Sequence, residues 1–229
     1  MSDPLPRSMA DDPIAELRDA VLAASLVHVP FDGWCWTALR RGALDAGLSA
    51  IDAERAFPGG GPDAIAHHNA LADRGMLAAM AATDPTGLKI REKIALAVRS
   101  RIDGVVTDRD AVRRGLALLA LPQHAPLAAR LLYRTVDTIW HAVGDSATDW
   151  NFYSKRALLA GVYSATLLYW LTDESPDRQA SWAFLDRRIA NVMALPRLTL
   201  RMGGLEELVG RFRSARTRAH VGPRANLKV

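Results

Sequence analysis

The sequence is poor in cysteine and aromatic residues, and it has no apolar run long enough to cross a membrane as a helix. Cys35 is the single cysteine among 229 residues, which excludes an intrachain disulfide and any metal site built from several thiolates. The uncharged run from Ala157 to Leu171 rises only about 22 Å as a helix. A hydrocarbon core is about 30 Å thick, so this run does not span it.

The first thirteen residues also lack an apolar core. They read MSDPLPRSMADDP, with three Asp and one Arg. A secretory signal needs an apolar stretch, and a transit peptide is rich in Arg and poor in acidic residues. We therefore expect neither of these segments, and we expect a cytoplasmic bacterial protein.

Positive charge is concentrated at one end of the chain. Residues 197–229 hold eight Arg or Lys and two Glu, a net charge of +6, whereas the whole chain carries +4. Residues 1–196 are therefore slightly acidic. A basic terminal segment suits an anionic membrane surface or nucleic acid, or it is a solvated tail that keeps the protein in solution.

Alternating runs of β-branched residues are missing, and Ala, Leu and Arg dominate nearly every segment. This composition with apolar residues at helical spacing predicts an all-α protein of about nine to ten helices. Capping residues, glycines and prolines give the expected bounds. The expected helices lie near 14–30, 36–46, 49–58, 64–80, 84–102, 108–122, 125–143, 146–171, 175–194 and 204–216.

The first helices have the order of a helix-turn-helix, since two short helices separated by a Gly-containing turn follow the first one. The candidate recognition helix is 49–57. Residues 31–62 carry three Arg against four acidic residues, and Asp52 and Glu54 lie on the candidate recognition helix. A protein that reads DNA gains most of its affinity by neutralising phosphates. We therefore expect no nucleic-acid partner.

Aromatic residues gather in the second half of the chain, where ten of the fifteen fall between Tyr133 and Phe184. The expected helix through 157–171 is apolar on all sides, so it must be buried by its own core together with a partner or a ligand. It lines a lipid pocket or a dimer seam, or it is a plain core helix. The candidate lipid-binding side chains are Trp140, Leu158, Tyr163, Leu167 and Trp170.

One polar stripe is a candidate for catalysis. Asp137, His141 and Asp145 are spaced i, i+4, i+8 and share one helix face. A metal site of this kind needs a matching Glu-x-x-His motif on a second helix, which is missing. Hydrogen bonding to Arg134 or to the pair 155–156 is the favoured interpretation, so we predict no metal and no catalytic residue.

Several segments resemble the Coq-nine family of ubiquinone biosynthesis. The resemblance covers roughly residues 14–194 and is most specific in 137–153. The segments that carry it are HVPFDGW (28–34), FPGGGPDAI (57–65), ALLALPQHAP (117–126), TVDTIWHAVGDSATDWNFYSKRALLAGVYSATLLYWLTD (135–173) and WAFLDRRIANVM (182–193).

The resemblance implies a TetR-like helical bundle with a vestigial helix-turn-helix that forms a homodimer and binds lipid in place of DNA. It further implies an accessory protein without catalysis of its own. Such a protein presents the demethoxy quinone intermediate to a membrane-associated di-iron hydroxylase, the Coq-seven protein. The implied ligand is an isoprenoid quinone intermediate or a phospholipid, with no other cofactor.

The family's partner-contact motif, Asn-Trp-Tyr, falls on Asn151, Phe152 and Tyr153. Phe152 replaces the family's Trp, which keeps an aromatic ring and loses the indole N–H donor. Lys155 and Arg156 match the basic pair that follows the motif. The resemblance thus implies a hydroxylase contact through these five residues.

The C-terminal segment has apolar residues at helical spacing among many arginines. It is either an interfacial membrane helix or a helix that docks on the body. The candidate membrane-binding residues are Met202, Leu205, Val209 and Phe212. With an anionic membrane surface as partner, the expected location is the cytoplasm, peripheral on the inner face of the bacterial plasma membrane.

The expected domain organisation has four parts. They are a flexible N-terminus (1–12), a helix-turn-helix-like part (13–61), a lipid-binding and dimerisation body (62–194) and the basic segment (195–229). Two alternative functions stay open. One is a TetR-type transcriptional regulator with an apolar effector pocket, and the other is a small helical metalloenzyme that uses Asp137 and His141.

Overall fold

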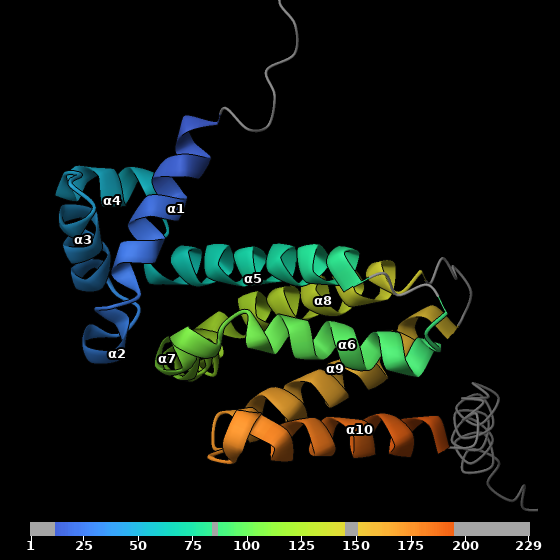
Figure 1. Ribbon diagram of the computed structural model, residues 1–229. Coiled ribbons are helices and arrows are strands. Elements are labelled where there is room, and N and C mark those ends of the chain that lie inside the picture. The colour runs from blue at the N-terminus through green and yellow to red at the C-terminus, as the bar shows by residue number, and fades with distance from the viewer. Residues whose placement is uncertain (1–11, 84–86, 145–150, 195–229) are drawn as a thin grey trace, which may run out of the picture. The chain divides into compact units, whose positions relative to one another are not determined.

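The computed structural model describes residues 12–83, 87–144 and 151–194, and within these ranges the chain is helical (Figure 1). The all-α prediction is confirmed. The α-helices are α1 (Pro13–Ser25), α2 (Val29–Asp32), α3 (Trp36–Asp45), α4 (Ala50–Ala56), α5 (Gly61–Thr83), α6 (Ile90–Asp103), α7 (Arg109–Leu119), α8 (Ala125–Ala142), α9 (Asn151–Trp170) and α10 (Gln179–Ala194).

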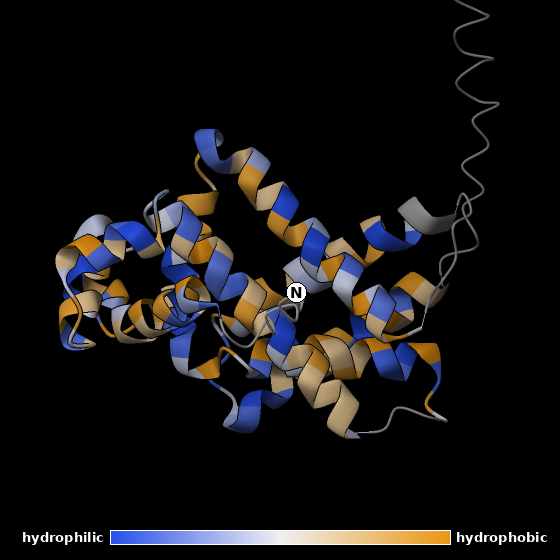
Figure 2. Cartoon of the chain, turned by 90° about the horizontal axis from the view of Figure 1, so that it is seen from above, coloured by the Kyte–Doolittle hydropathy of each residue, from blue (hydrophilic) through white to orange (hydrophobic). Residues whose placement is uncertain are grey.

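The chain divides into two compact units, 1–192 and 193–229, and the fold described below is that of the first. Short 3-10 turns precede three of its helices: Val106–Asp108 before α7, Pro122–His124 before α8 and Pro176–Arg178 before α10. Hydrophobic and hydrophilic residues alternate along the helices (Figure 2), as expected when one face of each helix packs inward. No helix in the described ranges is long and apolar enough to span a membrane.

The N-terminal helices α1, α3 and α4 pack together as a head (Figure 1). The Asp12 carboxylate accepts a hydrogen bond from the backbone N–H of Ile14 at 3.0 Å and caps α1. Ser49 and Asp52 form a reciprocal capping box at the start of α4, as the sequence predicts. A Cβ on Gly42 would lie 2.5 Å from the backbone nitrogen of Ser25, so only glycine allows α3 to approach α1 this closely.

The predicted end of the first helix is wrong. The first helix ends at Ser25, and Pro30 lies in the first turn of the separate helix α2, where proline's missing N–H is not needed. The predicted start near residue 108 is confirmed, since Asp108 is the N-cap residue of α7. Its carboxylate makes no capping hydrogen bond and accepts hydrogen bonds from His68 and Thr107 instead.

Other predicted helix starts lie outside the described residues. These are the starts of the helices expected at 84–102 and 146–171, and the whole helix expected at 204–216. In the described ranges the fifth predicted helix begins at Ile90 and the eighth at Asn151.

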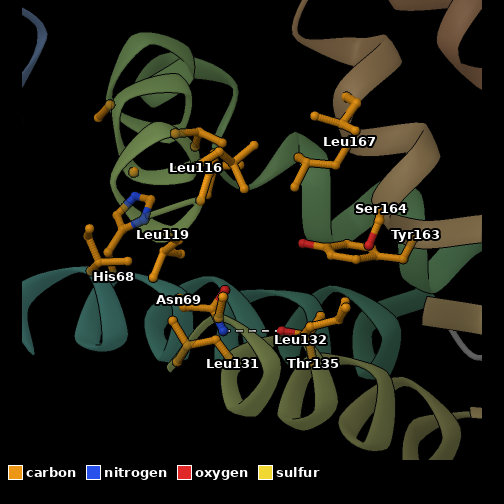
Figure 3. Close-up of a pocket in the computed structure, with 18 of the residues that line it drawn as sticks. His68, Asn69, Leu116, Leu119, Leu131, Leu132, Thr135, Tyr163, Ser164 and Leu167 are labelled. Atoms are coloured by element: carbon orange, nitrogen blue, oxygen red, sulfur yellow. Dashed lines mark hydrogen bonds between the residues drawn. The ribbon is translucent and has the colours of Figure 1, made fainter. Parts of the chain in front are cut away.

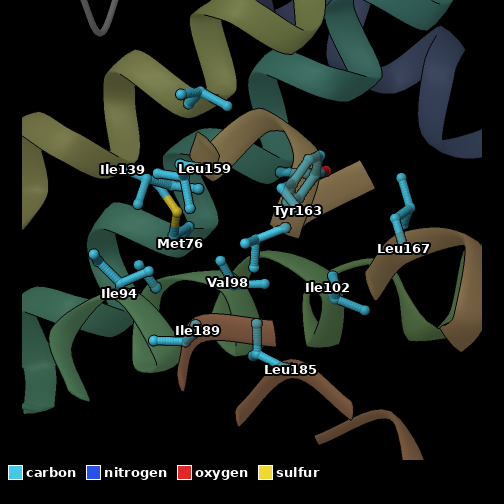
Figure 4. Close-up of a cluster of buried hydrophobic side chains, with 14 of the residues drawn as sticks. Met76, Ile94, Val98, Ile102, Ile139, Leu159, Tyr163, Leu167, Leu185 and Ile189 are labelled. Carbon is cyan, nitrogen blue, oxygen red and sulfur yellow. The ribbon is translucent and has the colours of Figure 1, made fainter. Parts of the chain in front are cut away.

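Buried apolar side chains gather in two clusters within the described residues. One fills the head, where it includes Leu22 and Phe57, and it extends to Ile65 of α5, Ala111 of α7 and Leu131 of α8. The other lies among α5, α6, α8, α9 and α10 and includes Val98 and Leu185 (Figure 4). The head is therefore joined to α5, α7 and α8 by a shared apolar cluster, and the rest of the body has a second one.

Helix α9 is buried by its own chain on one side only. Leu159, Val162 and Trp170 are buried in the body cluster. Leu168 is 59% exposed, and Tyr169 is 38% exposed while its ring stacks on Phe184 of α10. The chain alone thus leaves apolar surface of this helix uncovered.

Candidate functional site

A cavity of about 320 Å³ lies in the body of the first unit. It is bounded by α5, α7, α8 and α9, with Arg101 of α6 at its wall (Figure 3). Most of its lining is aliphatic. Leucine side chains reach it from three helices: Leu116 and Leu119 from α7, Leu131 and Leu132 from α8, and Leu167 and Leu168 from α9. A cavity of this size and character suits part of an apolar ligand.

One wall of the cavity is a hydrogen-bonded polar network. Arg101 donates from Nε to Asp73 Oδ1 at 2.6 Å and from Nη2 to Asn69 Oδ1 at 2.7 Å. Asn69 Nδ2 donates to Thr135 Oγ1 at 3.1 Å (Figure 3), and Thr135 Oγ1 donates to Asp73 Oδ1 at 3.0 Å. Helices α5, α6 and α8 are therefore joined by buried polar contacts at the cavity.

The network contains two opposite charges in an apolar setting. Asp73 is 6% exposed and Arg101 is 4% exposed. Each ion needs the other, because moving either one alone out of water costs several kcal/mol. Since the two charges cancel, this wall offers a ligand no uncompensated cation.

A second polar group closes the cavity near α7. His68 Nε2 and Asp108 Oδ2 lie 3.1 Å apart. The hydrogen bond from His68 lowers the pKa of Asp108 below its usual value, although burial raises it. Trp34 packs beside the His68 ring with ring centroids 5.7 Å apart, and its Nε1 donates to the carbonyl of Ala111 at 2.8 Å. These contacts connect α5, α7 and the turn before α3.

Tyr163 projects from α9 into the cavity, with its hydroxyl directed toward the empty space (Figure 3). Its side chain is buried, and the hydroxyl has no hydrogen-bond partner among the described residues. Burial raises the pKa of Tyr163, so the phenol keeps its proton at neutral pH. Ser164, the next residue, also lines the cavity.

The structure brings two of the five candidate lipid-binding residues to this cavity, Tyr163 and Leu167. Trp140 and Trp170 lie in the body cluster instead, and Leu158 is 42% exposed on α9. The sequence interpretation missed the polar wall altogether. Arg101 was the available signal, because a charged residue stands there on the apolar face that contains Val98 and Ile102.

The Asp137 stripe makes the predicted hydrogen bonds. Arg156 is 4% exposed, and its Nε and Nη2 donate to Asp137 Oδ1 at 2.9 and 2.7 Å. His141 Nε2 lies 3.4 Å from the other carboxylate oxygen of Asp137. In the described ranges no group of three or more His, Cys, Asp or Glu is placed to hold a metal ion. The Arg156 guanidinium is thus buried in the protein, and its hydrogen bonds to Asp137 join α9 to α8.

The remaining candidate contact residues belong to the start of α9 and to the C-terminal segment. Helix α9 begins at Asn151, so the motif 151–153 forms its first turn. The Lys155 ammonium lies 5.8 Å from the ring centroid of Trp140. The four candidate membrane-binding residues, Met202, Leu205, Val209 and Phe212, lie outside the described residues.

The arginines of the head are paired with carboxylates. These ion pairs reduce the positive charge available to a DNA phosphate. The expectation that the head does not read DNA stays a prediction, and the structure adds a physical reason for it. The pairs are Arg40–Glu54 at 2.7 Å, Arg41–Asp32 at 2.8 Å and Arg55–Asp52 at 3.0 Å.

The sequence of the chain is similar to that of a known protein family. Residues 125–196 match the sequence model of the COQ9 family. The chain is 33% identical over 187 residues to the rat mitochondrial ubiquinone biosynthesis protein COQ9, covering 78% of this chain and 59% of the rat protein. The chain is a homologue of the COQ9 proteins. The resemblance to the Coq-nine family is thus confirmed.

Two further COQ9 relatives agree with this. The human protein is 32% identical and covers 78% of this chain, and the Drosophila melanogaster protein is 31% identical and covers 87%. The chain spans about three fifths of the length of these relatives. All three are mitochondrial by name, so the expected location on the inner face of a bacterial plasma membrane is wrong.

The predicted TetR-like fold is also confirmed. A TetR transcriptional regulator from Nitrosomonas europaea superposes with a TM-score of 0.64 at 18% sequence identity. The match covers 79% of this chain and 99% of the regulator. At this identity the likeness concerns the fold alone.

Proposed function

We propose that this chain is a lipid-binding accessory protein of ubiquinone biosynthesis. In this proposal it holds part of the demethoxy quinone intermediate and presents it to a di-iron hydroxylase, without catalysis of its own. The observation that carries the proposal is the aliphatic cavity with a polar wall, in a homologue of proteins named for ubiquinone biosynthesis. Apolar lining with a few placed polar groups is typical of sites for small apolar ligands.

The size of the cavity favours lifting one end of the lipid over carrying all of it. Burying the carbons of one isoprene unit is worth about 4 kcal/mol, so a polyprenyl tail stays in the bilayer unless other apolar surface covers it. A cavity of about 320 Å³ covers only part of such a molecule. The protein therefore acts at a membrane surface while most of the tail remains in the lipid.

The exposed apolar residues of α9 support a homodimer. Leu158, Leu168 and Tyr169 are all more than a third exposed in the single chain. We expect sedimentation at micromolar concentration to show a dimer, and Leu168→Arg to shift it toward monomer because a charge would enter the seam. Leu121→Arg is the matched control, because Leu121 is 43% exposed and lies between α7 and the 3-10 turn Pro122–His124, away from α9. A well-folded wild-type monomer would contradict this assembly.

Loss of the gene is expected to lower ubiquinone and to accumulate its demethoxy precursor, because the hydroxylase would lose its presented substrate. Quinone pools extracted from cells grown with oxygen give the measurement. Wild type and Leu121→Trp should restore ubiquinone, whereas Leu116→Trp should not, since its indole fills the cavity. Unchanged pools in the deletion strain would remove the main support for this function.

We also expect the hydroxylase contact and the membrane contact to separate by mutation. Changing Phe152 and Tyr153 together to Ala should weaken hydroxylase binding and leave binding to anionic vesicles nearly intact, since aromatic side chains are enriched at partner sites. Removing residues 197–229 should weaken binding to anionic vesicles and leave hydroxylase binding nearly intact. Basic residues near an anionic surface contribute about 1 kcal/mol each, and salt screens that attraction.

The measurement is co-sedimentation with phosphatidylcholine vesicles with and without phosphatidylglycerol, alongside hydroxylase pull-down. High salt should mimic the truncation. The division of roles would be wrong if the truncated chain bound anionic vesicles like wild type, or if the double variant still bound the hydroxylase as tightly.

A further inference from the structure

The short helix α2 carries large apolar side chains on its outward side. Phe31 is 82% exposed, the largest exposed fraction among the large apolar residues that the structure describes, and Val27 is 68% exposed. His28 between them is also in the α conformation, so residues four positions apart here share one side. Val29, on the opposite side, is fully buried. Val27, just before the helix, and Phe31, within it, therefore form one outward apolar surface, the α2 patch.

The charged groups beside the α2 patch are bonded to one another. Arg41 Nη1 of α3 donates to Asp32 Oδ2 at 2.8 Å, and His28 Nε2 lies 2.5 Å from Asp45 Oδ2. These contacts fix α2 against the end of α3. Leu44, the residue before Asp45, is itself 60% exposed. Neither an anionic nor a cationic partner finds a free charge of opposite sign in these pairs.

Helix α2 also lies beside the cavity. Arg114 Nη2 of α7 donates to the Pro30 carbonyl at 2.9 Å, and α7 forms one wall of the cavity. Trp34, two residues after the end of α2, lines the same cavity. Figure 1 shows α2 and α7 side by side at one end of the body. A partner that covers the α2 patch is therefore brought close to the cavity.

We propose that the α2 patch inserts into the interfacial layer of a zwitterionic phospholipid bilayer, as a membrane contact separate from the basic segment 197–229. Exposed apolar surface marks a contact with a protein or with a membrane. The paired charges favour a bilayer that carries no net charge. The position beside the cavity favours it as well, because an apolar lipid stays in the bilayer until protein surface covers it. This inference rests on the proposed function, which places the protein at a membrane.

The test is co-sedimentation of the full chain with vesicles of pure phosphatidylcholine, where the basic segment has no anionic lipid to bind. Wild type should bind these vesicles, and added salt should not weaken the binding, because no ionic attraction is there to be screened. Phe31→Ala should bind at least about tenfold more weakly. A tenfold loss corresponds to about 1.4 kcal/mol, which is less than the burial of a whole aromatic side chain contributes.

Two further variants serve as controls. Phe31→Trp keeps a large aromatic ring suited to the membrane interface and should bind like wild type. Ile90→Ala removes an apolar side chain that is 58% exposed at the start of α6, at the opposite end of the body from α2 (Figure 1). This variant should also bind like wild type, since the contact belongs to α2 and not to exposed apolar residues in general.

The inference is wrong if wild type does not bind phosphatidylcholine vesicles, or if Phe31→Ala binds them like wild type. Loss of hydroxylase binding in Phe31→Ala with unchanged vesicle binding would identify the α2 patch as a protein contact instead. These results leave the proposed function standing, because it depends on the cavity and is tested by the quinone pools of Leu116→Trp. Conversely, unchanged quinone pools in the deletion strain would overturn the proposed function, and a tenfold loss of vesicle binding in Phe31→Ala would still establish the membrane contact.

Discussion

Replacing Asp73 with Ala is expected to lower the free energy of unfolding by about 3–5 kcal/mol, the range found when one partner of a buried ion pair is removed. The substitution leaves the Arg101 guanidinium, which is 4% exposed, without its counter-ion. It also takes an acceptor from the Thr135 hydroxyl. Urea unfolding at neutral pH, followed by far-ultraviolet circular dichroism, gives the measurement.

An exposed pair in the same body provides the control. Arg99 Nη2 lies 2.8 Å from Asp186 Oδ2, and their side chains are 37% and 56% exposed. Asp186→Ala should cost less than about 1 kcal/mol, because water replaces the lost partner and screens the charge. If the two variants had the same free energy of unfolding, the buried Asp73–Arg101 pair would contribute no more to stability than an exposed pair does.

Much of the fold can be predicted from local signals. Ser49 with Asp52 predicts a helix start, and Gly47 predicts the end of the helix before it; its φ of +74° is one that glycine adopts without strain. Pro30 shows the limit of such signals. A proline is compatible with the end of one helix and with the first turn of the next, and tertiary packing decides between them.

The candidate cavity could be predicted only in part. Because α9 is apolar nearly all round, its sequence marks no preferred face, and Trp170 was therefore as good a candidate as Tyr163. Both residues belong to the body cluster, but packing brings only Tyr163 to the wall of the cavity. The polar wall joins residues 28 to 66 positions apart on three helices, so no local pattern reveals it.

Acidification is expected to destabilise the connection between α9 and α10 through Asp173. This carboxylate is 6% exposed and accepts hydrogen bonds from the backbone N–H of Ser175 at 2.9 Å and of Ser181 at 2.8 Å, and from the Ser181 hydroxyl. Burial raises the pKa of Asp173, but the hydrogen bonds from Ser181 and Ser175 outweigh burial and hold it well below its usual value. The folded state therefore binds this proton less readily than the unfolded state does.

The sign of the effect follows from that difference. Stability from Asp173 is fully present above the unfolded pKa of about 3.9 and is lost as the pH falls through that value toward the lower folded pKa. At neutral pH, Asp173→Ala should cost about 3 kcal/mol, since hydrogen bonds to a charged group contribute about 1.5–3 kcal/mol. Below that pH window the variant and wild type should converge in stability.

Glu174 supplies the matched control, because it is the next acidic residue and is exposed. Glu174→Ala should stay within about 0.5 kcal/mol of wild type at neutral pH, as surface substitutions usually do. Chemical unfolding from neutral pH to below pH 3 measures the three proteins together. A gap between wild type and Asp173→Ala that did not shrink on acidification would show that the carboxylate's charge does not hold the turn, and that packing around residues 173–181 does.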